Sequence, residues 1–300
     1  MVERQQFVVR FWGVRGSYPT PGPETLRHGG NTACIEVQAG KHILIFDAGT
    51  GIIALGHHLL QKAEEEPLNL SLFITHGHGD HLQGFPFFTP LFEQRTHLSC
   101  FGPRLTDQNI EQVLSTLMAP PYFPVEISKL PSQRQFHTLS EEKCIIWCYG
   151  ENFPRIVSVH EDMRNVEVCV RVNFTECHPL DGAVHYRVEY GGHSMVYATD
   201  VEWKGDYDPG FLSLAHGTDM LIHDAQYTNE DYQHTKEGFG HSTVAMATGA
   251  ANAAHAGELV LFHHEPLYTD IQLDAMEAEA RTQFAATRSA YEGMEIDLLA

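Results

Sequence analysis

Short apolar runs recur along the chain between polar, glycine-rich or proline-rich segments, and they predict buried β-strands. They occupy residues 7–11, 33–38, 42–46, 70–74, 97–101, 143–149, 155–159, 166–176, 194–199, 219–223 and 258–262. Apolar positions at helical spacing predict helices over residues 52–66, 107–118, 243–254 and 270–290, and residues 82–88 are expected to begin another. The expected N-caps of the last three listed helices are Thr106 or Asp107, Ser242 or Thr243, and Asp270. An α/β chain of 300 residues often folds as one unit, so residues 1–300 are expected to form one domain.

One segment, residues 74–81 with the sequence ITHGHGDH, joins the strand at 70–74 to the predicted helix at 82–88. It holds four potential metal ligands, which are His76, His78, Asp80 and His81. Imidazole and carboxylate groups suit zinc, manganese or iron. The two glycines between them lack a Cβ, so the loop can curl tightly and turn several side chains to one side. Because one ion cannot easily take all four groups, we expect two ions, with the first two ligands on one and the last two on the other.

Composition narrows the classes of protein to consider. The net charge of −20 disfavours a duplex nucleic acid as partner, because affinity for a duplex comes largely from Lys and Arg. No apolar run reaches the roughly 18 residues of a membrane helix, and the N-terminus lacks the apolar core of a signal peptide. Six cysteines without CxxC spacing are expected to be reduced core thiols of a cytoplasmic protein.

The HxHxDH segment resembles the signature of the metallo-β-lactamase fold superfamily. The N-terminal pattern WGVRGSxPxPG…GGNTxCxEV…DAGTG resembles a branch related to ribonuclease Z and PhnP-type phosphodiesterases. The resemblance implies a four-layered αββα sandwich of two mixed β-sheets flanked by helices, whose halves join between residues 140 and 175. It also implies that Asp47 lies behind the metal ligands without binding an ion, although a turn or helix-cap residue is an equally open interpretation.

The same resemblance implies three further ligands, each at the end of a predicted strand: His178, Asp200 and His263. His185 competes with the first, but it lies inside an alternating strand with one face expected in solvent. His264 competes with the last, but it points the opposite way. The first site would then hold His76, His78 and His178, and the second Asp80, His81 and His263, with Asp200 bridging. We expect two divalent ions, zinc foremost, with manganese or iron as alternatives.

Two more motifs resemble the phosphodiesterase branch: HDAQY at 223–227 and GHST at 240–243. In the family, the histidine of the second motif contacts the scissile phosphate, and the acid of the first orients it. Here these residues are His241 and Asp224, where glutamate is usual. With Asp80 they complete the predicted catalytic set. The predicted function is phosphodiester hydrolysis through a hydroxide held between two metals, with His241 stabilising charge or protonating the leaving oxygen.

The predicted substrates are small phosphodiesters or cyclic nucleotides, because the chain lacks a long Gly/Pro/Lys-rich insertion between His81 and His178 that could grip tRNA. Alternatives are a thioester or other ester hydrolase, a ribonuclease Z-like tRNA 3′ endonuclease, and a metal-binding sensor without turnover. A homodimer is left open. In the Gly- and Pro-rich loop at 12–32, Arg15, Arg27 and His28 are either solvated charges or contacts for one phosphate.

Overall fold

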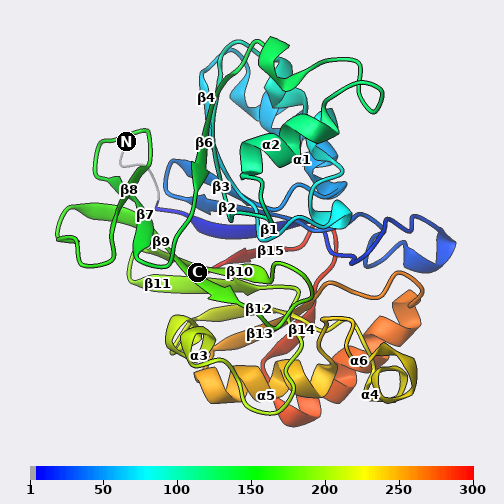
Figure 1. Cartoon of the computed structure of the whole chain (residues 1–300). Helices are drawn as coiled ribbons and strands as arrows, with labels where there is room; N and C mark the ends of the chain where they lie inside the picture. The colour runs from blue at the N-terminus through cyan, green and yellow to red at the C-terminus, as the bar shows by residue number, and fades with distance from the viewer. Residues whose placement is uncertain (1–4) are drawn as a thin grey trace.

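The computed structural model describes residues 5–300, which form two mixed β-sheets packed face to face with helices on both outer faces (Figure 1). The first sheet has the strand order β15-β1-β2-β3-β4-β5-β6. Its strands are β1 (Phe7–Gly13), β2 (Cys34–Ala39), β3 (His42–Phe46), β4 (Leu68–Phe73), β5 (Thr96–Gly102), β6 (Gln133–Thr138) and β15 (Glu295–Asp297). From β3 to β6 the strands run parallel, and the others pair antiparallel.

The second sheet has the strand order β14-β13-β12-β11-β10-β9-β7-β8. Its strands are β7 (Lys143–Cys148), β8 (Arg155–Ser158), β9 (Val166–Thr175), β10 (Ala183–Tyr190), β11 (His193–Ala198), β12 (Met220–Asp224), β13 (Glu258–Phe262) and β14 (Thr287–Ser289). The four strands from β11 to β14 are parallel. Ligands in α/β folds bind beyond the carboxyl ends of parallel strands. Each of the two sheets has a set of parallel strands with such ends.

Helices cover the outer faces. On the first sheet these are α1 (Gly51–Ala63) and α2 (Ile110–Leu117), and on the second they are α3 (Pro209–Ala215), α5 (Val244–Ala254) and α6 (Asp270–Gln283), with α4 (Asn229–Asp231) a single short turn. The inner faces enclose an aromatic core in which the rings of Phe46 and Phe73 stack 5.1 Å apart. The predicted αββα sandwich is therefore confirmed. In residues 5–300, no helix has both the length and the apolar character needed to cross a membrane.

Most predicted strands are present, but three predictions about helices were wrong. Residues 82–88 do not begin an α-helix and instead form 3-10 turns at Phe85–Phe87 and Thr89–Phe92, because Pro86 and Pro90 have no N–H to donate. The last helix ends at Gln283 rather than at 290, and residues 287–289 form the edge strand β14 beside β13. Helix α2 begins three residues later than predicted.

The N-caps also differ. Helix α2 is capped by Asn109 and α6 by Thr269, in each case with a side chain that accepts from the third residue of its helix. Thr243 caps α5, one of the two residues expected there. The strands β6, β14 and β15 were not predicted from the sequence. Each is short, and it is recognised as a strand by its pairing with a neighbour in the sheet. The last of them returns the chain to the first sheet, so the two halves interleave.

Candidate metal centre

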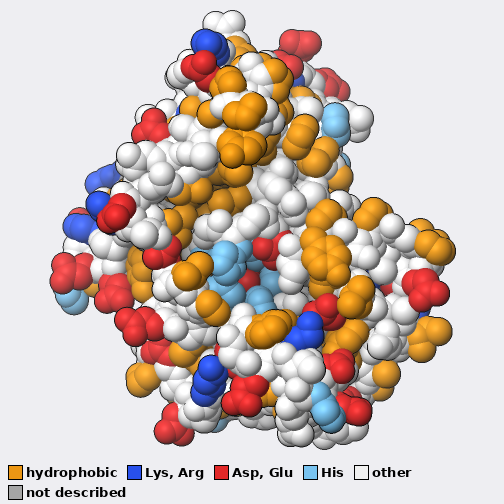
Figure 2. All heavy atoms as spheres, turned by 45° about the vertical axis from the view of Figure 1, so that its right-hand side comes forward, with side chains coloured by type: hydrophobic (Ala, Val, Ile, Leu, Met, Phe, Trp, Pro, Cys, Tyr) orange, Lys and Arg blue, Asp and Glu red, His pale blue; other side chains and the backbone are white. Residues whose placement is uncertain are grey.

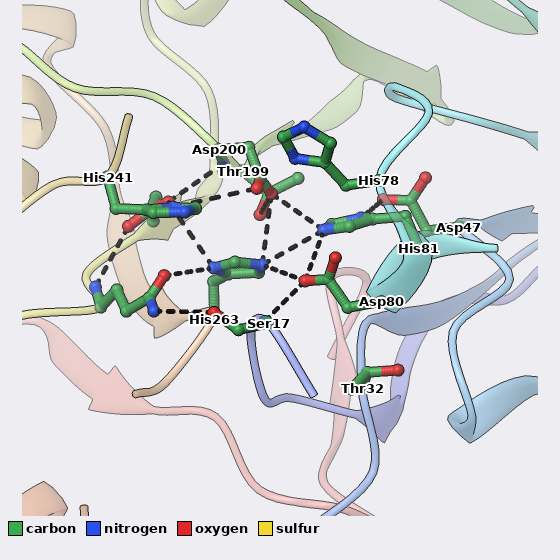
Figure 3. A network of polar contacts seen from close by, with 12 residues as sticks. Ser17, Thr32, Asp47, His78, Asp80, His81, Thr199, Asp200, His241 and His263 are labelled. Atoms are coloured by element: carbon green, nitrogen blue, oxygen red, sulfur yellow. Dashed lines mark hydrogen bonds and ion pairs between the residues drawn. The ribbon is translucent and has the colours of Figure 1, made fainter. Parts of the chain in front are cut away.

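The seven predicted ligands lie together between the carboxyl ends of the two sheets. Five of them, His78, Asp80, His81, Asp200 and His263, are labelled in Figure 3. His76, His78, Asp80 and His81 follow β4, and His178 follows β9. Asp200 follows β11 and His263 follows β13. All but His78 are buried. Elements far apart in the sequence therefore bring their polar ends to one point, in the cleft that Figure 2 shows floored by histidine and acidic side chains.

One half of the cluster, which we call half-site one, comprises His76, His78, His178 and one oxygen of Asp200. His178 Nε2 lies 3.1 Å from His78 Nδ1 and 3.8 Å from Asp200 Oδ1. His76 Nε2 lies 3.5 Å from the same oxygen. The ring nitrogens thus converge on one small volume beside one carboxylate oxygen.

The other half, half-site two, comprises Asp80, His81, His263 and the second oxygen of Asp200. His81 Nε2 lies 3.1 Å from both His263 Nε2 and Asp200 Oδ2. Asp80 Oδ2 lies 3.1 Å from His263 Nε2 and 3.3 Å from His81 Nε2. Two carboxylates and two imidazoles therefore meet here, against one carboxylate and three imidazoles in half-site one.

These separations suit divalent ions. Four ligand atoms bound tetrahedrally at about 2.0–2.2 Å lie roughly 3.3–3.6 Å from one another, close to the spacings observed. The buried Nε2 of His76 has no hydrogen-bond partner among the described residues, as expected of an atom that awaits a cation. The histidine and aspartate cluster thus supports divalent metal binding, and the division of Asp200 between the two halves suits a pair of ions.

A set of buried groups orients the ligand rings from behind. His81 Nδ1 pairs with Asp47 Oδ2 at 2.7 Å, and Asp47 also accepts hydrogen bonds from the Thr75 backbone and the Tyr197 hydroxyl. His178 Nδ1 lies 2.9 Å from the carbonyl oxygen of Gly240. These contacts leave the opposite nitrogen of each ring facing the cluster. Asp47 thus lies behind a ligand, as the resemblance implied, and it is also a positive-φ turn residue.

The backbone is strained where it delivers these side chains. Asp47, Asp200 and His263 have φ values of 62°, 54° and 62°, in the left-handed region that non-glycine residues seldom adopt. Such strain persists where surrounding contacts fix it, and it clusters at functional sites. Gly16 approaches so closely that a Cβ on it would lie 2.4 Å from the His263 ring, so the loop at 12–32 packs directly on half-site two.

The two halves differ in electrostatics. Burial lowers the pKa of His76, and it also lowers the pKa values of His78 and His178. Burial opposes protonation of His263 too, but the carboxylates of Asp200 and Asp80 outweigh it and raise its pKa to about 9. The same competition, joined by Asp47, raises the pKa of His81 well above its ordinary value. A proton or a metal ion is needed to offset the carboxylates of half-site two.

The predicted pair of His241 and Asp224 lies beside the cluster. His241 Nδ1 is 2.8 Å from Asp224 Oδ2, so the shorter aspartate does reach the ring. Asp224 also accepts hydrogen bonds from the backbone N–H groups of Asp200 and Ser242. The His241 ring stacks on the His263 ring at a centroid distance of 4.9 Å, and its Nε2 is left for a group entering the cleft.

Several candidates from the sequence lie elsewhere. Arg15 is fully buried and donates to the carbonyl oxygens of Gly29, Glu265 and Tyr268, so neither interpretation of it was right. Arg27 pairs with Asp274 at the surface, as a solvated charge would. Three histidines named in the sequence analysis, His28, His185 and His264, do not join the cluster either.

His28 is buried and reaches the carbonyl oxygen of Ala290, so it is not a solvated charge. His185 is wholly buried against Phe211, contrary to the expected solvated face, because α3 covers that side of β10. His264 turns away from the cluster to the carbonyl of Ala290, as strand alternation predicted. Five of the cysteines are buried and Cys177 is half-buried, and all six are free.

Sequence reasoning missed Gln226. Its Oε1 lies 3.0 Å from His263 Nδ1, and its Nε2 donates to Ser17 Oγ and Glu265 Oε2. The backbone N–H of Ser17 in turn donates to Asp80 Oδ2 at 2.7 Å. Gln226 lies in the HDAQY segment just after a strand, which marked it as a candidate site residue. The sequence could not show what it contacts, because its partners come from distant segments.

Comparison with known proteins gives consistent relatives. A family model described as "Beta-lactamase superfamily domain" matches residues 42–264. Ribonuclease Z of Thermoplasma acidophilum is 24% identical over 96% of this chain and 95% of its own. Ribonuclease Z of Brevibacillus brevis is 27% identical over 94% of each chain.

Among solved structures, the metallo-beta-lactamase fold protein YhfI of Bacillus subtilis matches with a TM-score of 0.66 and 18% identity, over 98% of this chain and 100% of that one. A diphosphatase of the PhnP family gives a TM-score of 0.64 and 16% identity, over 97% of each chain. The short form of human tRNase Z gives 0.62 and 21%, over 96% of this chain and 98% of that one. At these identities the likeness establishes the fold.

Proposed function

Because the chain belongs to the β-lactamase superfamily, we propose that it is a metal-dependent phosphodiesterase acting on small phosphodiesters or cyclic nucleotides. The relatives named above are hydrolases, which supports a hydrolytic reaction for this chain. The proposal adds two divalent ions, zinc foremost, held by half-site one and half-site two with Asp200 shared between them.

The observation that carries the proposal is the position of His241. Its Nδ1 is held by Asp224 at 2.8 Å and its ring stacks on that of a proposed ligand, so it is oriented beside the metals but is not needed to complete either half-site. A positioned imidazole at that place can protonate a leaving oxygen or stabilise developing negative charge. Phosphodiester cleavage needs such a group because its leaving group is a poor one.

The remaining residues have supporting roles. Bound divalent ions would supply a water molecule acidified to a pKa of about 7 and would screen the charge of the phosphate. Asp80 is a proposed ligand of half-site two, and the N–H of Ser17 fixes its orientation. Asp224 keeps one tautomer of His241 and, through the backbone of Asp200, ties it to the shared ligand.

The names of the relatives favour a second candidate. Ribonuclease Z enzymes match over more than nine-tenths of both chains, which supports an RNA substrate. Against it stands the net charge of −20, which disfavours a long polyanion. A thioesterase remains a weaker alternative, since an alkylthiolate leaving group has less need of a proton donor.

We expect His241→Ala to keep its metal content and to lose about 10²-fold or more of kcat on a diester with an alkoxide leaving group. The control is His160→Ala, which removes an exposed histidine between β8 and β9. Metal analysis and kcat/KM should be measured on small diesters, a thioester and a precursor tRNA at about 0.15 M salt. Site-specific cleavage of the precursor with poor turnover of small diesters would replace the proposal by ribonuclease Z. Unchanged kcat in the variant would remove His241 from the mechanism.

A further inference from the structure

The cleft around the metal centre is lined by charged groups of both signs. Figure 2 shows hydrophobic side chains around the histidine-floored hollow and only sparse basic groups near it. Beside His76 and His78 lies a cavity of about 380 Å³. Its apolar lining includes Leu105, Val113 and Leu180, and its acidic lining is Asp107 and Asp181. We call this side the acidic wall, because Asp107 and Asp181 line the cavity and its lining includes no Lys or Arg.

The side of the cleft beside His241 holds a cation, Lys236. The Nζ of Lys236 lies 5.2 Å from the ring centre of Tyr227 and 5.6 Å from that of Phe239. The Tyr227 ring is 5.9 Å from the His241 ring, so one aromatic ring separates the ammonium from the proposed proton donor. We call Lys236, Tyr227 and Phe239 the basic wall. Phe239 is half exposed, so this wall is open to a ligand.

Lys236 is only loosely neutralised. Its nearest carboxylate oxygen is Glu265 Oε2 at 3.9 Å, at the limit of an ion pair, and that oxygen already accepts a hydrogen bond from Gln226. A second lysine lies near this part of the cleft. Lys204 is largely exposed, and its ammonium lies 3.5 Å from the buried carboxylate of Glu202. The ammonium of Lys236 therefore has donors to spare for an anion.

We propose that the basic wall binds a second anionic group of the substrate, a terminal phosphate on the leaving-group side of the scissile phosphodiester. This inference rests on the proposed function. His241 and Lys236 both lie beside Tyr227. The leaving group, whose oxygen takes the proton from His241, is therefore also the part of the substrate that carries the terminal phosphate. The acidic wall takes the other substituent, which must be uncharged where it meets Asp107 and Asp181.

A dinucleotide with a 5′-phosphate, pApA, fits this arrangement. Water adds to the internal phosphorus, the bond from phosphorus to the 3′ oxygen breaks, and that oxygen takes a proton from His241, which the attacking water replaces. The products are two molecules of adenosine 5′-monophosphate. The isomer ApAp carries the same charge, but its terminal phosphate would lie against the acidic wall. ApA carries no terminal phosphate.

The test compares kcat/KM for these three dinucleotides in the metal-loaded wild type, Lys236→Gln and Lys236→Arg. A charge-assisted hydrogen bond contributes about 1.5–3 kcal/mol, so the wild type should prefer pApA to ApAp by about 10-fold or more. Lys236→Gln should reduce that ratio about 10-fold, and Lys236→Arg should largely keep it. The control is Lys62→Gln, which removes the same charge from α1 on the outer face and should leave the ratio unchanged.

Binding provides a second readout that does not need turnover. Methylphosphonate analogues of pApA and ApAp resist cleavage, and their Kd ratio should show the same preference and the same dependence on Lys236. Equal kcat/KM for pApA and ApAp in the wild type would overturn the inference while leaving a phosphodiesterase. An equal loss on all three substrates in Lys236→Gln would also overturn it, since that would indicate a structural role through Glu265. If no dinucleotide is cleaved, the proposed function fails on these substrates and the Kd ratio alone decides the inference.

Discussion

Half-site one and half-site two use the same residue types in opposite electrostatic settings. In half-site one, three imidazoles with lowered pKa values share one carboxylate oxygen, and the group behind His178 is a neutral carbonyl. In half-site two, Asp80 and Asp200 face two imidazoles, and the carboxylate of Asp47 lies behind one of them. The first is ready to bind an ion without losing protons. The second has more negative charge but holds protons when no metal is bound.

The magnitudes indicate which half binds more tightly. A divalent ion about 4 Å from one carboxylate gains on the order of 8 kcal/mol at an effective dielectric constant near 20. Displacing a proton from His263, whose pKa is about 9, costs only about 2 kcal/mol near pH 7.5. We infer that the extra carboxylate outweighs the protons held by His263 and His81, so half-site two fills first and half-site one loses its ion more easily.

The largest effect is expected from Asp200→Asn. This change alters both half-sites at once, because Asp200 contributes one oxygen to each of them. An amide presents one oxygen and no charge, so both ions should be held more weakly. We expect kcat/KM to fall by about 10³-fold or more, since the ions supply several kcal/mol of stabilisation. Metal analysis after dialysis should give clearly less than the wild-type content. Retention of both ions would show that Asp200 is not shared.

A smaller effect, confined to one half, is expected from Gln226→Leu. The leucine fills similar space but cannot hold His263 Nδ1, which the wild-type amide contacts at 3.0 Å. Removing a group that orients a metal ligand usually costs about 10–100-fold in metal affinity. Competition with a chelator should show this loss for the tighter ion only. Gln233→Leu, at an exposed position, is the matched control. Loss of the weaker ion instead would exchange the two assignments.

The smallest expected effect is the pH dependence of metal binding. His263 is protonated at pH 7.5 in the metal-free protein because its pKa is raised to about 9, so an ion entering half-site two must displace that proton. The affinity of half-site two should therefore rise with pH through about pH 9, and the raised pKa of His81 adds to this dependence. The lowered pKa values in half-site one predict little change above pH 7. Calorimetric titration in two buffers of different ionisation enthalpy should show more protons released with the first ion than with the second, because the pKa values of both His263 and His81 are raised.

The family and the fold could be predicted from local patterns, and both are confirmed. The HxHxDH loop gives four proposed ligands from neighbouring positions, because a tight loop with two glycines can turn several side chains to one side. The sandwich followed from the resemblance, and the short apolar runs predicted the strands within it. The helix over 82–88 and the extension of α6 to 290 were wrong, since local spacing does not report the prolines' missing donors or the partner strand β13.

The sequence by itself determined which residue types could bind metal and where strands would end, because apolar periodicity and ligand chemistry are local properties. It could not decide what Arg15 and Gln226 do. Both depend on groups more than 30 positions away, and their roles as a buried clamp and as the support of His263 exist only when distant segments meet. The tertiary structure alone also set the charge difference between the two half-sites. A pKa depends on burial and on neighbouring charges in space, and those are fixed by packing rather than by order along the chain.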